Sequence, residues 1–98
     1  MLTGKKIVLG VSGGIAAYKM ANVASMLSKL HADIHVVMTE NATHFITPET
    51  FEVLTGNHCY TDTFDRCMEL HVPHIALGTQ ADAILIAPAS ADVVGKIA

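Results

Sequence analysis

A glycine- and serine-rich stretch near the amino terminus has the residue types of two kinds of site. Gly10-Val11-Ser12-Gly13-Gly14 follows the apolar run Lys6–Val11 and precedes a predicted helix. It matches the G-x-S-x-G pattern, in which a strand-to-helix turn presents a nucleophilic serine. Its glycines would equally let the backbone approach an anion, which the N–H groups opening the next helix would face. It matches neither G-x-G-x-x-G nor the P-loop, because Ser12 replaces the second glycine and no Gly-Lys-Ser/Thr follows.

The position of Ser12 in the chain favours the anion-binding interpretation. In hydrolases with a serine elbow, strands that precede the nucleophile supply an oxyanion loop. Here the serine follows the first predicted strand, so we expect no such loop upstream. The stretch is therefore predicted to bind an anion, and the plainer alternative is a tight turn that only packs.

A second turn of small residues supports a ligand site. Pro88, Ala89, Ser90 and Ala91 directly follow the apolar run Ala83–Ala87. In a doubly wound parallel sheet the carboxyl ends of the strands share one edge, and ligands bind there at the switch point of the strand order. Two small-residue loops at that edge predict a site for a nucleotide or a flavin.

Histidines and cysteines in the second half of the chain could suggest a metal site. The cysteines, Cys59 and Cys67, are further apart than the ligands of a usual zinc knuckle. Only His71 and His74 have ligand-like spacing. We therefore predict no metal site, and we expect these residues at the surface or at an edge.

Apolar runs and helical periodicity predict an alternation of strands and helices. Buried strands are expected at Lys6–Val11, Asp33–Met38 and Ala83–Ala87, and a short edge strand at His58–Thr61. Helices are expected where apolar residues recur every three or four positions (Ala16, Met20, Val23, Leu27, Leu30), from Thr47-Pro48-Glu49 to Gly56, at Pro73–Gln80 and at Ala91–Ala98. Residues Asp62–Val72 show no clear period.

This alternation predicts a single α/β domain over residues 1–98, with a parallel, Rossmann-like sheet between two helical layers. The strands Lys6–Val11 and Ala83–Ala87 should be central neighbours, as the first and fourth strands are in the doubly wound order.

Composition excludes several classes of protein. Hydrophobic residues make up 51% of the 98 residues, which is typical of a globular chain. The net charge of −3, with no block of like charge, argues against a nucleic-acid surface. No run approaches the ~20 apolar residues of a membrane span. Two cysteines do not make a disulfide framework, so a reducing, cytoplasmic setting is expected.

Three segments carry a resemblance to a known family. These are KKIVLGVSGGIAAYK, MTENATHFITPETFEVLTG and HIALGTQADAILIAPASADVVGKIA, which together cover most of the chain. Their order is a glycine–serine loop, T-E-N-A-T-H-F, H-I-x-L and P-A-S-A. The chain resembles the amino-terminal half of phosphopantothenoylcysteine decarboxylase and, more broadly, the homo-oligomeric flavin-containing cysteine decarboxylases.

The resemblance implies an FMN enzyme that decarboxylates phosphopantothenoylcysteine to phosphopantetheine, a step toward coenzyme A. The flavin would supply the redox chemistry that makes the carboxylate labile, while the protein supplies placement and proton transfer. His74, in H-I-x-L, matches the catalytic base. The implied cofactor contacts are Ser12 and Gly13 on the phosphate side, Thr39 and Phe45 along the flavin, and Pro88, Ala89, Ser90 and Ala91 at its ring or ribityl chain. FMN would lie at contacts between the subunits of a trimer or trimer-based homo-oligomer.

Two departures from the family pattern leave alternatives open. Asp92-Val93 stands where the family has Asn-Thr, and the downstream motif P-x-M-N-x-x-M-W and a lid cysteine are not among the 98 residues. We therefore expect an incomplete domain that is inactive alone. The alternatives are a non-catalytic FMN-binding or oligomerising module and a relative of the flavin prenyltransferases, although H-I-x-L and T-E-N-A-T favour the decarboxylases.

Overall fold

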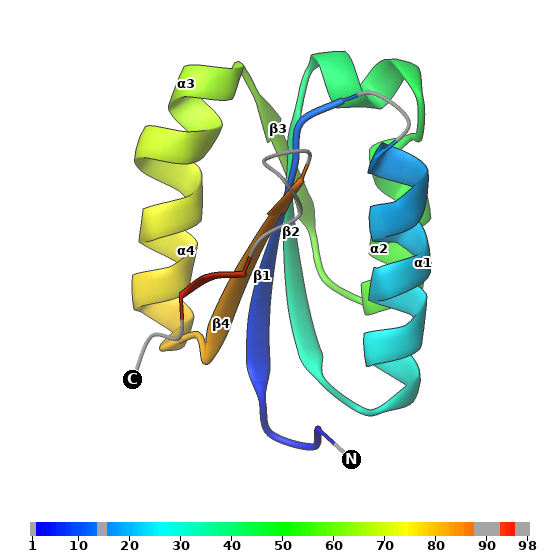
Figure 1. Ribbon diagram of the computed structural model, residues 1–98, viewed down its shortest axis with the longest axis vertical. Coiled ribbons are helices and arrows are strands. Elements are labelled where there is room, and N and C mark those ends of the chain that lie inside the picture. Colours follow the sequence, from blue (N-terminus) through cyan, green and yellow to red (C-terminus); the bar gives the residue numbers. More distant parts are fainter. Residues whose placement is uncertain (1, 14–15, 88–92, 96–98) are drawn as a thin grey trace.

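The computed structural model describes residues 2–13, 16–87 and 93–95, and its centre is one twisted sheet (Figure 1). The strand order is β3-β2-β1-β4-β5. The strands are β1 (Lys6–Val11), β2 (Asp33–Thr39), β3 (Cys59–Asp62), β4 (Ala83–Ala87) and β5 (Val93–Gly95). The first four are parallel, and β5 is antiparallel to β4. The predicted central pair is confirmed, because β1 and β4 are parallel neighbours with Leu9 opposite Leu85.

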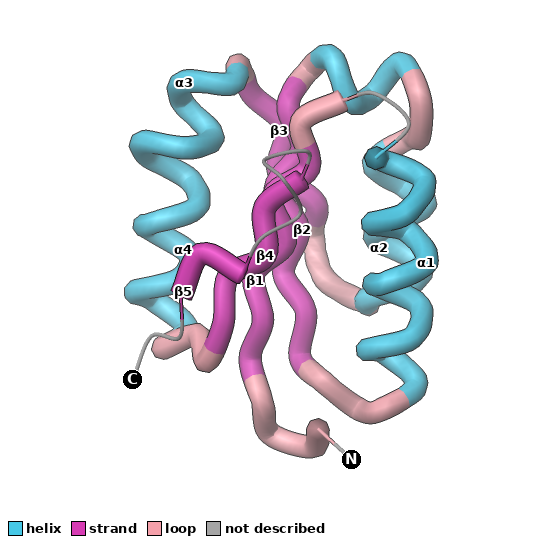
Figure 2. The backbone as a smooth tube through the Cα atoms, viewed as in Figure 1, coloured by secondary structure: helices cyan, strands magenta, loops and turns pink. Residues whose placement is uncertain are grey.

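Helices cover both faces of the sheet, as Figures 1 and 2 show. On one face lie α1 (Ala16–Lys29) and α2 (Pro48–Thr55). On the other lies a continuous helical segment made of α3 (Phe64–Arg66), the π-helical turn η2 (Cys67–His71) and α4 (Val72–Thr79). A short 3₁₀ helix, η1 (Asn41–His44), follows β2. The predicted three-layer α/β fold is therefore confirmed. Within the described residues, no helix is both long and apolar enough to cross a membrane.

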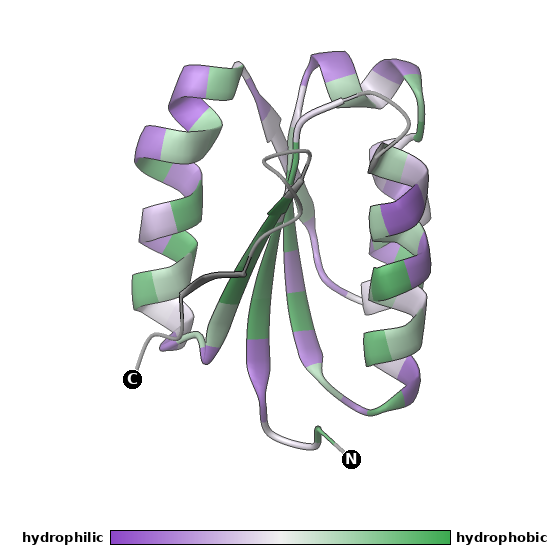
Figure 3. Ribbon diagram, in the orientation of Figure 1, coloured by the Kyte–Doolittle hydropathy of each residue, from purple (hydrophilic) through white to green (hydrophobic). Residues whose placement is uncertain are grey.

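The core has two parts because successive strand residues point to opposite faces of the sheet. Toward α1 and α2, the fully buried residues include Leu9, Ile34, Met38 and Phe51. Toward α4 they include Val8, Val37 and Cys67. Figure 3 shows hydrophobic residues concentrated on the strands between the helical layers. This burial on both faces explains why the central strand β1 is a nearly continuous apolar run in the sequence.

Local signals predicted α2 correctly. Thr47 precedes the helix with an extended backbone (φ −75°, ψ 149°), and Pro48 occupies the first turn. Thr47 Oγ1 hydrogen-bonds Thr50 Oγ1 at 3.0 Å, so its side chain does not cap a backbone N–H group. Gly56 ends the helix with a left-handed backbone (φ 76°), a conformation that glycine adopts without a Cβ penalty.

Residues Asp62–Val72, which show no clear hydrophobic period, contain most of a helical segment. Thr63 begins it, because its Oγ1 accepts a hydrogen bond from the Arg66 N–H group at 3.4 Å. In η2 the Val72 N–H group donates to the Cys67 carbonyl, which is the i→i+5 bond of a π-helix. A π-helical turn contains more residues than an α-helical turn, so it changes the spacing of the buried side chains along the sequence. A search for hydrophobic residues with a period of 3.6 therefore does not detect this helix.

The helix predicted at Ala91–Ala98 is wrong over Val93–Gly95. These residues form β5, with Val93 opposite Leu85 and Gly95 opposite Ile84. Two β-branched residues followed by glycine have low helix propensity, and the outer edge of β4 offers backbone groups for pairing. The rest of the predicted helix, residues 91–92 and 96–98, lies outside the described residues.

Candidate functional site

The loops that follow β1 and β2 meet at the carboxyl edge of the sheet. Gly13 has a φ of 95°, a backbone conformation that favours glycine. A Cβ atom at this position would lie 2.7 Å from Nδ2 of Asn41 in η1. The glycine–serine loop therefore rests directly on the asparagine of T-E-N-A-T. The structure thus brings Ser12 and Gly13 beside the segment that begins at Thr39.

Thr39 stabilises the loop that follows β2 at this edge of the sheet. Its side chain is buried, with 3% of the residue exposed, and its Oγ1 accepts a hydrogen bond from the Ala42 N–H group at 3.2 Å. Thr43 Oγ1 donates to the Glu40 carbonyl at 2.6 Å and closes the same turn. Phe45 ends η1 and is 38% exposed. Thr39 therefore holds the loop in place, and its contact with a cofactor, like that of Phe45, stays a prediction.

Gly10 has a packing role in the same motif. A Cβ atom there would lie 3.3 Å from Cγ1 of Ile86 and 3.4 Å from Cε of Met68. The first glycine of G-x-S-x-G therefore allows β4 and the helical segment to pack closely against β1.

An ionic cluster that no sequence motif had indicated lies at the end of β3. Asp62 Oδ2 is 2.8 Å from Nε2 of His71 and accepts a hydrogen bond from Nε of Arg66 at 2.9 Å. Asp62 Oδ1 accepts one from the Thr63 N–H group at 2.8 Å. The contact with His71, then those with Arg66 and Thr63, lower the pKa of Asp62 to about 2. The only sequence signal is the i, i+4 spacing of Asp62 and Arg66 at a helix start.

The same cluster joins the edge strand to the helical segment. The ring of Tyr60 in β3 stacks on His71, with 5.9 Å between centroids and 21° between planes. The Asp62 carbonyl accepts a hydrogen bond from the Glu40 N–H group at 2.8 Å, which ties β3 to the end of β2. These contacts hold the end of β3 against the helical segment and against the end of β2, at the carboxyl edge of the sheet.

Both cysteine side chains are buried, so the expectation of a surface position is wrong for them, although Cys59 lies on the edge strand β3. Cys67 Sγ donates to the Met38 carbonyl at 3.2 Å and so holds η2 against β2. Burial raises the pKa of Cys59 to about 12 and also raises that of Cys67. Both behave as small apolar residues, the usual role of a free buried cysteine. In the described part of the chain, no three His, Cys, Asp or Glu residues gather as metal ligands would.

His74 lies apart from these loops. It is an exposed residue of α4, in the helical layer that lies across the sheet from α1. Met68, in the same helical segment, approaches Gly10. In the described part of the chain, no hydrogen bond or ion pair joins His74 to Ser12, Gly13 or Thr39.

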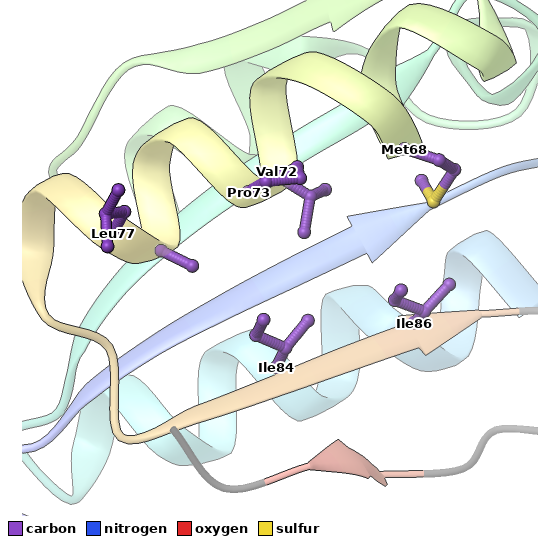
Figure 4. Close-up of a pocket in the computed structure, with 7 residues that line it drawn as sticks. Met68, Val72, Pro73, Leu77, Ile84 and Ile86 are labelled. Atoms are coloured by element: carbon purple, nitrogen blue, oxygen red, sulfur yellow. The ribbon is translucent and has the colours of Figure 1, made fainter. Parts of the chain in front are cut away.

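A cavity of about 430 Å³ lies between α4 and β4, and we call it the α4–β4 groove (Figure 4). Its lining is apolar throughout: Met68, Val72, Pro73, Ala76, Leu77, Ile84 and Ile86. The groove lies on the face of β4 that points toward α4. The predicted contacts Pro88, Ala89, Ser90 and Ala91, and the divergent Asp92, lie outside the described residues.

Comparison with known proteins identifies relatives of the whole chain. The family model described as Flavoprotein matches residues 1–98. Coenzyme A biosynthesis bifunctional protein CoaBC from Haemophilus influenzae is 45% identical over 96 residues, which are 98% of this chain and 24% of that protein. The Escherichia coli K12 protein of the same name is 45% identical over 97 residues, 99% of this chain and 24% of the relative. The chain thus spans about a quarter of the length of these relatives.

Solved structures with the same fold are cysteine decarboxylases and a related protein. The FMN-dependent cysteine decarboxylase SpaF superposes with a TM-score of 0.65 at 30% identity, over 91% of this chain and 51% of that one. MrsD from Bacillus sp. HIL-Y85/54728 superposes with a TM-score of 0.61 at 25% identity, over 90% of this chain and 50% of that one. The family model covers every residue of the chain, and the fold agrees with it. The chain therefore belongs to the Flavoprotein family, and it spans about half of the decarboxylase fold to which it is similar.

Proposed function

We propose that this chain carries the amino-terminal half of a site for the FMN-dependent decarboxylation of phosphopantothenoylcysteine to phosphopantetheine, in coenzyme A biosynthesis. The contact between Gly13 and Asn41 is the main structural support. It joins two loops at the edge of a doubly wound sheet where ligands bind. The identity of about 45% to CoaBC proteins supports the choice of reaction.

The residues at this edge fit the phosphate end of FMN. Gly13 has the positive φ of a loop whose backbone comes close to a ligand, and Ser12 is half-buried beside it. In the proposal, the Ser12 hydroxyl and backbone N–H groups donate hydrogen bonds to the phosphate. Phe45 and the loop from Pro88 to Ala91 border the flavin, and Thr39 keeps the loop after β2 in shape. When bound, FMN supplies the redox chemistry of the reaction.

His74 is the proposed base. Its exposed position on α4 lets its imidazole exchange protons with solvent. Because His74 is exposed on α4, in the helical layer across the sheet from α1, we assign it to a cofactor held by a neighbouring copy. This arrangement agrees with a homo-oligomer, trimeric or trimer-based, as the functional form of the complete protein.

The share of the related structures that this chain covers favours a second function. The chain covers about half of the SpaF and MrsD chains, so a protein with these residues alone would lack the other half of the fold. It would then be a non-catalytic module that binds FMN or associates with other copies. Carbon dioxide release separates this function from the first, since both predict flavin binding.

An FMN titration tests the cofactor site. We expect the purified chain to quench flavin fluorescence, and Ser12→Ala to weaken FMN binding about tenfold, or ~1.4 kcal/mol, through loss of a hydrogen bond to a charged group. Ser25→Ala is the matched control, because Ser25 is also half-buried but lies in the middle of α1. Equal affinities for the two variants would show that the glycine–serine loop does not hold the phosphate.

A second experiment tests the base. In a version of the chain extended by the rest of a flavoprotein domain, we expect His74→Asn to abolish carbon dioxide release and leave the flavin spectrum intact. Retained activity would overturn the assignment of the base. Loss of bound FMN would instead show that His74 has a structural role.

A further inference from the structure

The helical segment that carries His74 has an irregular backbone just before that residue. The Val72 N–H group donates to the Cys67 carbonyl in the π-helical turn, and Pro73, the next residue, has no N–H group to donate. The ladder of backbone hydrogen bonds is therefore interrupted where η2 meets α4. His74 follows directly, in the first turn of α4. The direction of its side chain therefore depends on what holds this junction.

Apolar packing holds the junction on the sheet without fixing its rotation. Cys67 and Val72 are both buried although they are five residues apart. In a regular α-helix, at about 100° per residue, these two side chains would point ~140° apart, and the π-helical turn brings both toward the sheet. Burial of apolar surface is non-directional, so it stabilises the helix on the sheet more than it sets the angle about the helix axis.

His71 supplies a directional contact at this junction. Its Nε2 lies 2.8 Å from Oδ2 of Asp62 at the end of β3, and the ring of Tyr60 stacks on it at 21° between planes. His71 is the last residue of η2 and precedes His74 by three positions, so the two side chains are neighbours on the helix surface. His71 therefore ties the turn that carries His74 to β3.

Asp62 is itself held in place. Its Oδ1 accepts a hydrogen bond from the Thr63 N–H group, and its carbonyl accepts one from the Glu40 N–H group, both at 2.8 Å. The contact with His71 is the largest cause that lowers the pKa of Asp62 to about 2, so at neutral pH the carboxylate is ionised and only accepts hydrogen bonds. Nε2 of His71 is therefore the donor in their contact. Arg66 Nε donates to the same oxygen at 2.9 Å.

We propose that Asp62 is a positioning residue for His74, because its hydrogen bond with His71 fixes the junction of η2 and α4 and so the direction of the proposed base. The inference rests on the proposed function, in which His74 transfers the proton. Asp62 and His71 touch neither substrate nor cofactor in this arrangement and act only through the helix. Such support matters because a misplacement of about 1 Å can lower a rate about a hundredfold.

Kinetics of the extended version of the chain test this inference. We expect Asp62→Ala and His71→Ala each to lower kcat for carbon dioxide release about tenfold, while KM and the amount of bound FMN change less than twofold. The double variant should be no slower than either single variant, because both substitutions remove the same contact. His71→Gln should keep most of kcat, since the glutamine amide also donates a hydrogen bond to a carboxylate.

Asp65→Ala is the matched control, because Asp65 is an exposed acid in the first turn of the same helical segment, and it should leave kcat unchanged. A second readout uses the 98-residue chain without flavin. Amide hydrogen exchange over residues 72–76 should be faster in Asp62→Ala and His71→Ala than in Asp65→Ala, because the junction has lost its directional contact.

Four results would overturn the inference: unchanged kcat in both alanine variants, a double variant much slower than either single variant, equal losses in His71→Gln and His71→Ala, or a loss of bound FMN in parallel with kcat. If the unmodified extended version releases no carbon dioxide, the proposed function fails and the inference fails with it. If it is active and Asp62→Ala is equally active, the inference alone is wrong.

Discussion

Replacement of Gly13 by alanine should destabilise the chain through two separable effects. The φ of 95° places any L-residue in a strained backbone region, at a cost of ~1–2 kcal/mol. The new Cβ would also lie 2.7 Å from Asn41 Nδ2, so the amide must move away. Moving a side chain off its preferred rotamer costs ~0.5–1.5 kcal/mol. We therefore expect Gly13→Ala to lower the free energy of unfolding by about 1.5–3.5 kcal/mol.

Gly56→Ala separates the two effects. Gly56 has a similar positive φ of 76°, but nothing lies within 4 Å of the point that a Cβ atom would occupy there. Its replacement should therefore cost only the backbone strain of ~1–2 kcal/mol. Asn41→Ala in the Gly13→Ala background should recover about 1 kcal/mol, because it removes the steric conflict and leaves the strain.

Urea denaturation followed by circular dichroism measures Gly13→Ala, Gly56→Ala, Asn41→Ala and the Gly13→Ala/Asn41→Ala double variant, and an unchanged m-value keeps the comparison valid. A Gly13→Ala variant that loses no more stability than Gly56→Ala would refute the contact between the two loops. So would a double-mutant cycle with no coupling between positions 13 and 41.

Four further predictions concern the charge of Asp62, the ionisation of Cys59, thiol reactivity and packing. The lowered pKa of Asp62, about 2, means that its ionised form stabilises the fold above pH ~4, and that this stabilisation is lost as the pH falls through about 2. Asp62→Asn should therefore make the free energy of unfolding depend less on pH at acid pH. The control variant Asp65→Asn, at an exposed position, should not have this effect. The raised pKa of Cys59, about 12, means that folding favours its neutral thiol and that stability falls as the pH rises from about 9 toward 12. At pH 8, Cys59 and Cys67 should react with a thiol reagent only after urea unfolds the chain, and fast labelling of the native chain would contradict their burial. Phe51→Ala, at a fully buried position, should cost about 3–5 kcal/mol in urea unfolding, and a loss below ~1 kcal/mol would show that this side chain is not in the core.

The parallel sheet could be predicted because its signals are local. The strands β1, β2 and β4 are rich in apolar residues, and β1 and β2 are buried on both faces of the sheet. The helix α2 lies between a proline and a left-handed glycine. Each signal depends on residues within a few positions of one another. The doubly wound order predicted that β1 and β4 are neighbours, and the structure confirms this pair.

The candidate site was predictable only in part. The two loops expected at one edge were Gly10–Gly14 and Pro88–Ala91, and the second lies outside the described residues. The contact of Gly13 with Asn41, close to Thr39, came only from the structure. The exposure of His74 agrees with the expected surface position, but its place in the helical layer opposite α1 was not predictable, because the H-I-x-L motif shows only its neighbours along the chain.

The sequence by itself determined the fold class, the main strands and the family pattern, because these depend on hydrophobic periodicity and short motifs. Only the tertiary structure decided the contacts between distant positions: Gly13 on Asn41, Cys67 against the Met38 carbonyl, and Asp62 beside His71. It also decided that β5 pairs with the free edge of β4. Such contacts join residues that are far apart in the sequence and close only in the packed fold. A π-helical turn or an unpaired strand edge alters which residues meet, and neither has a local signal in the sequence.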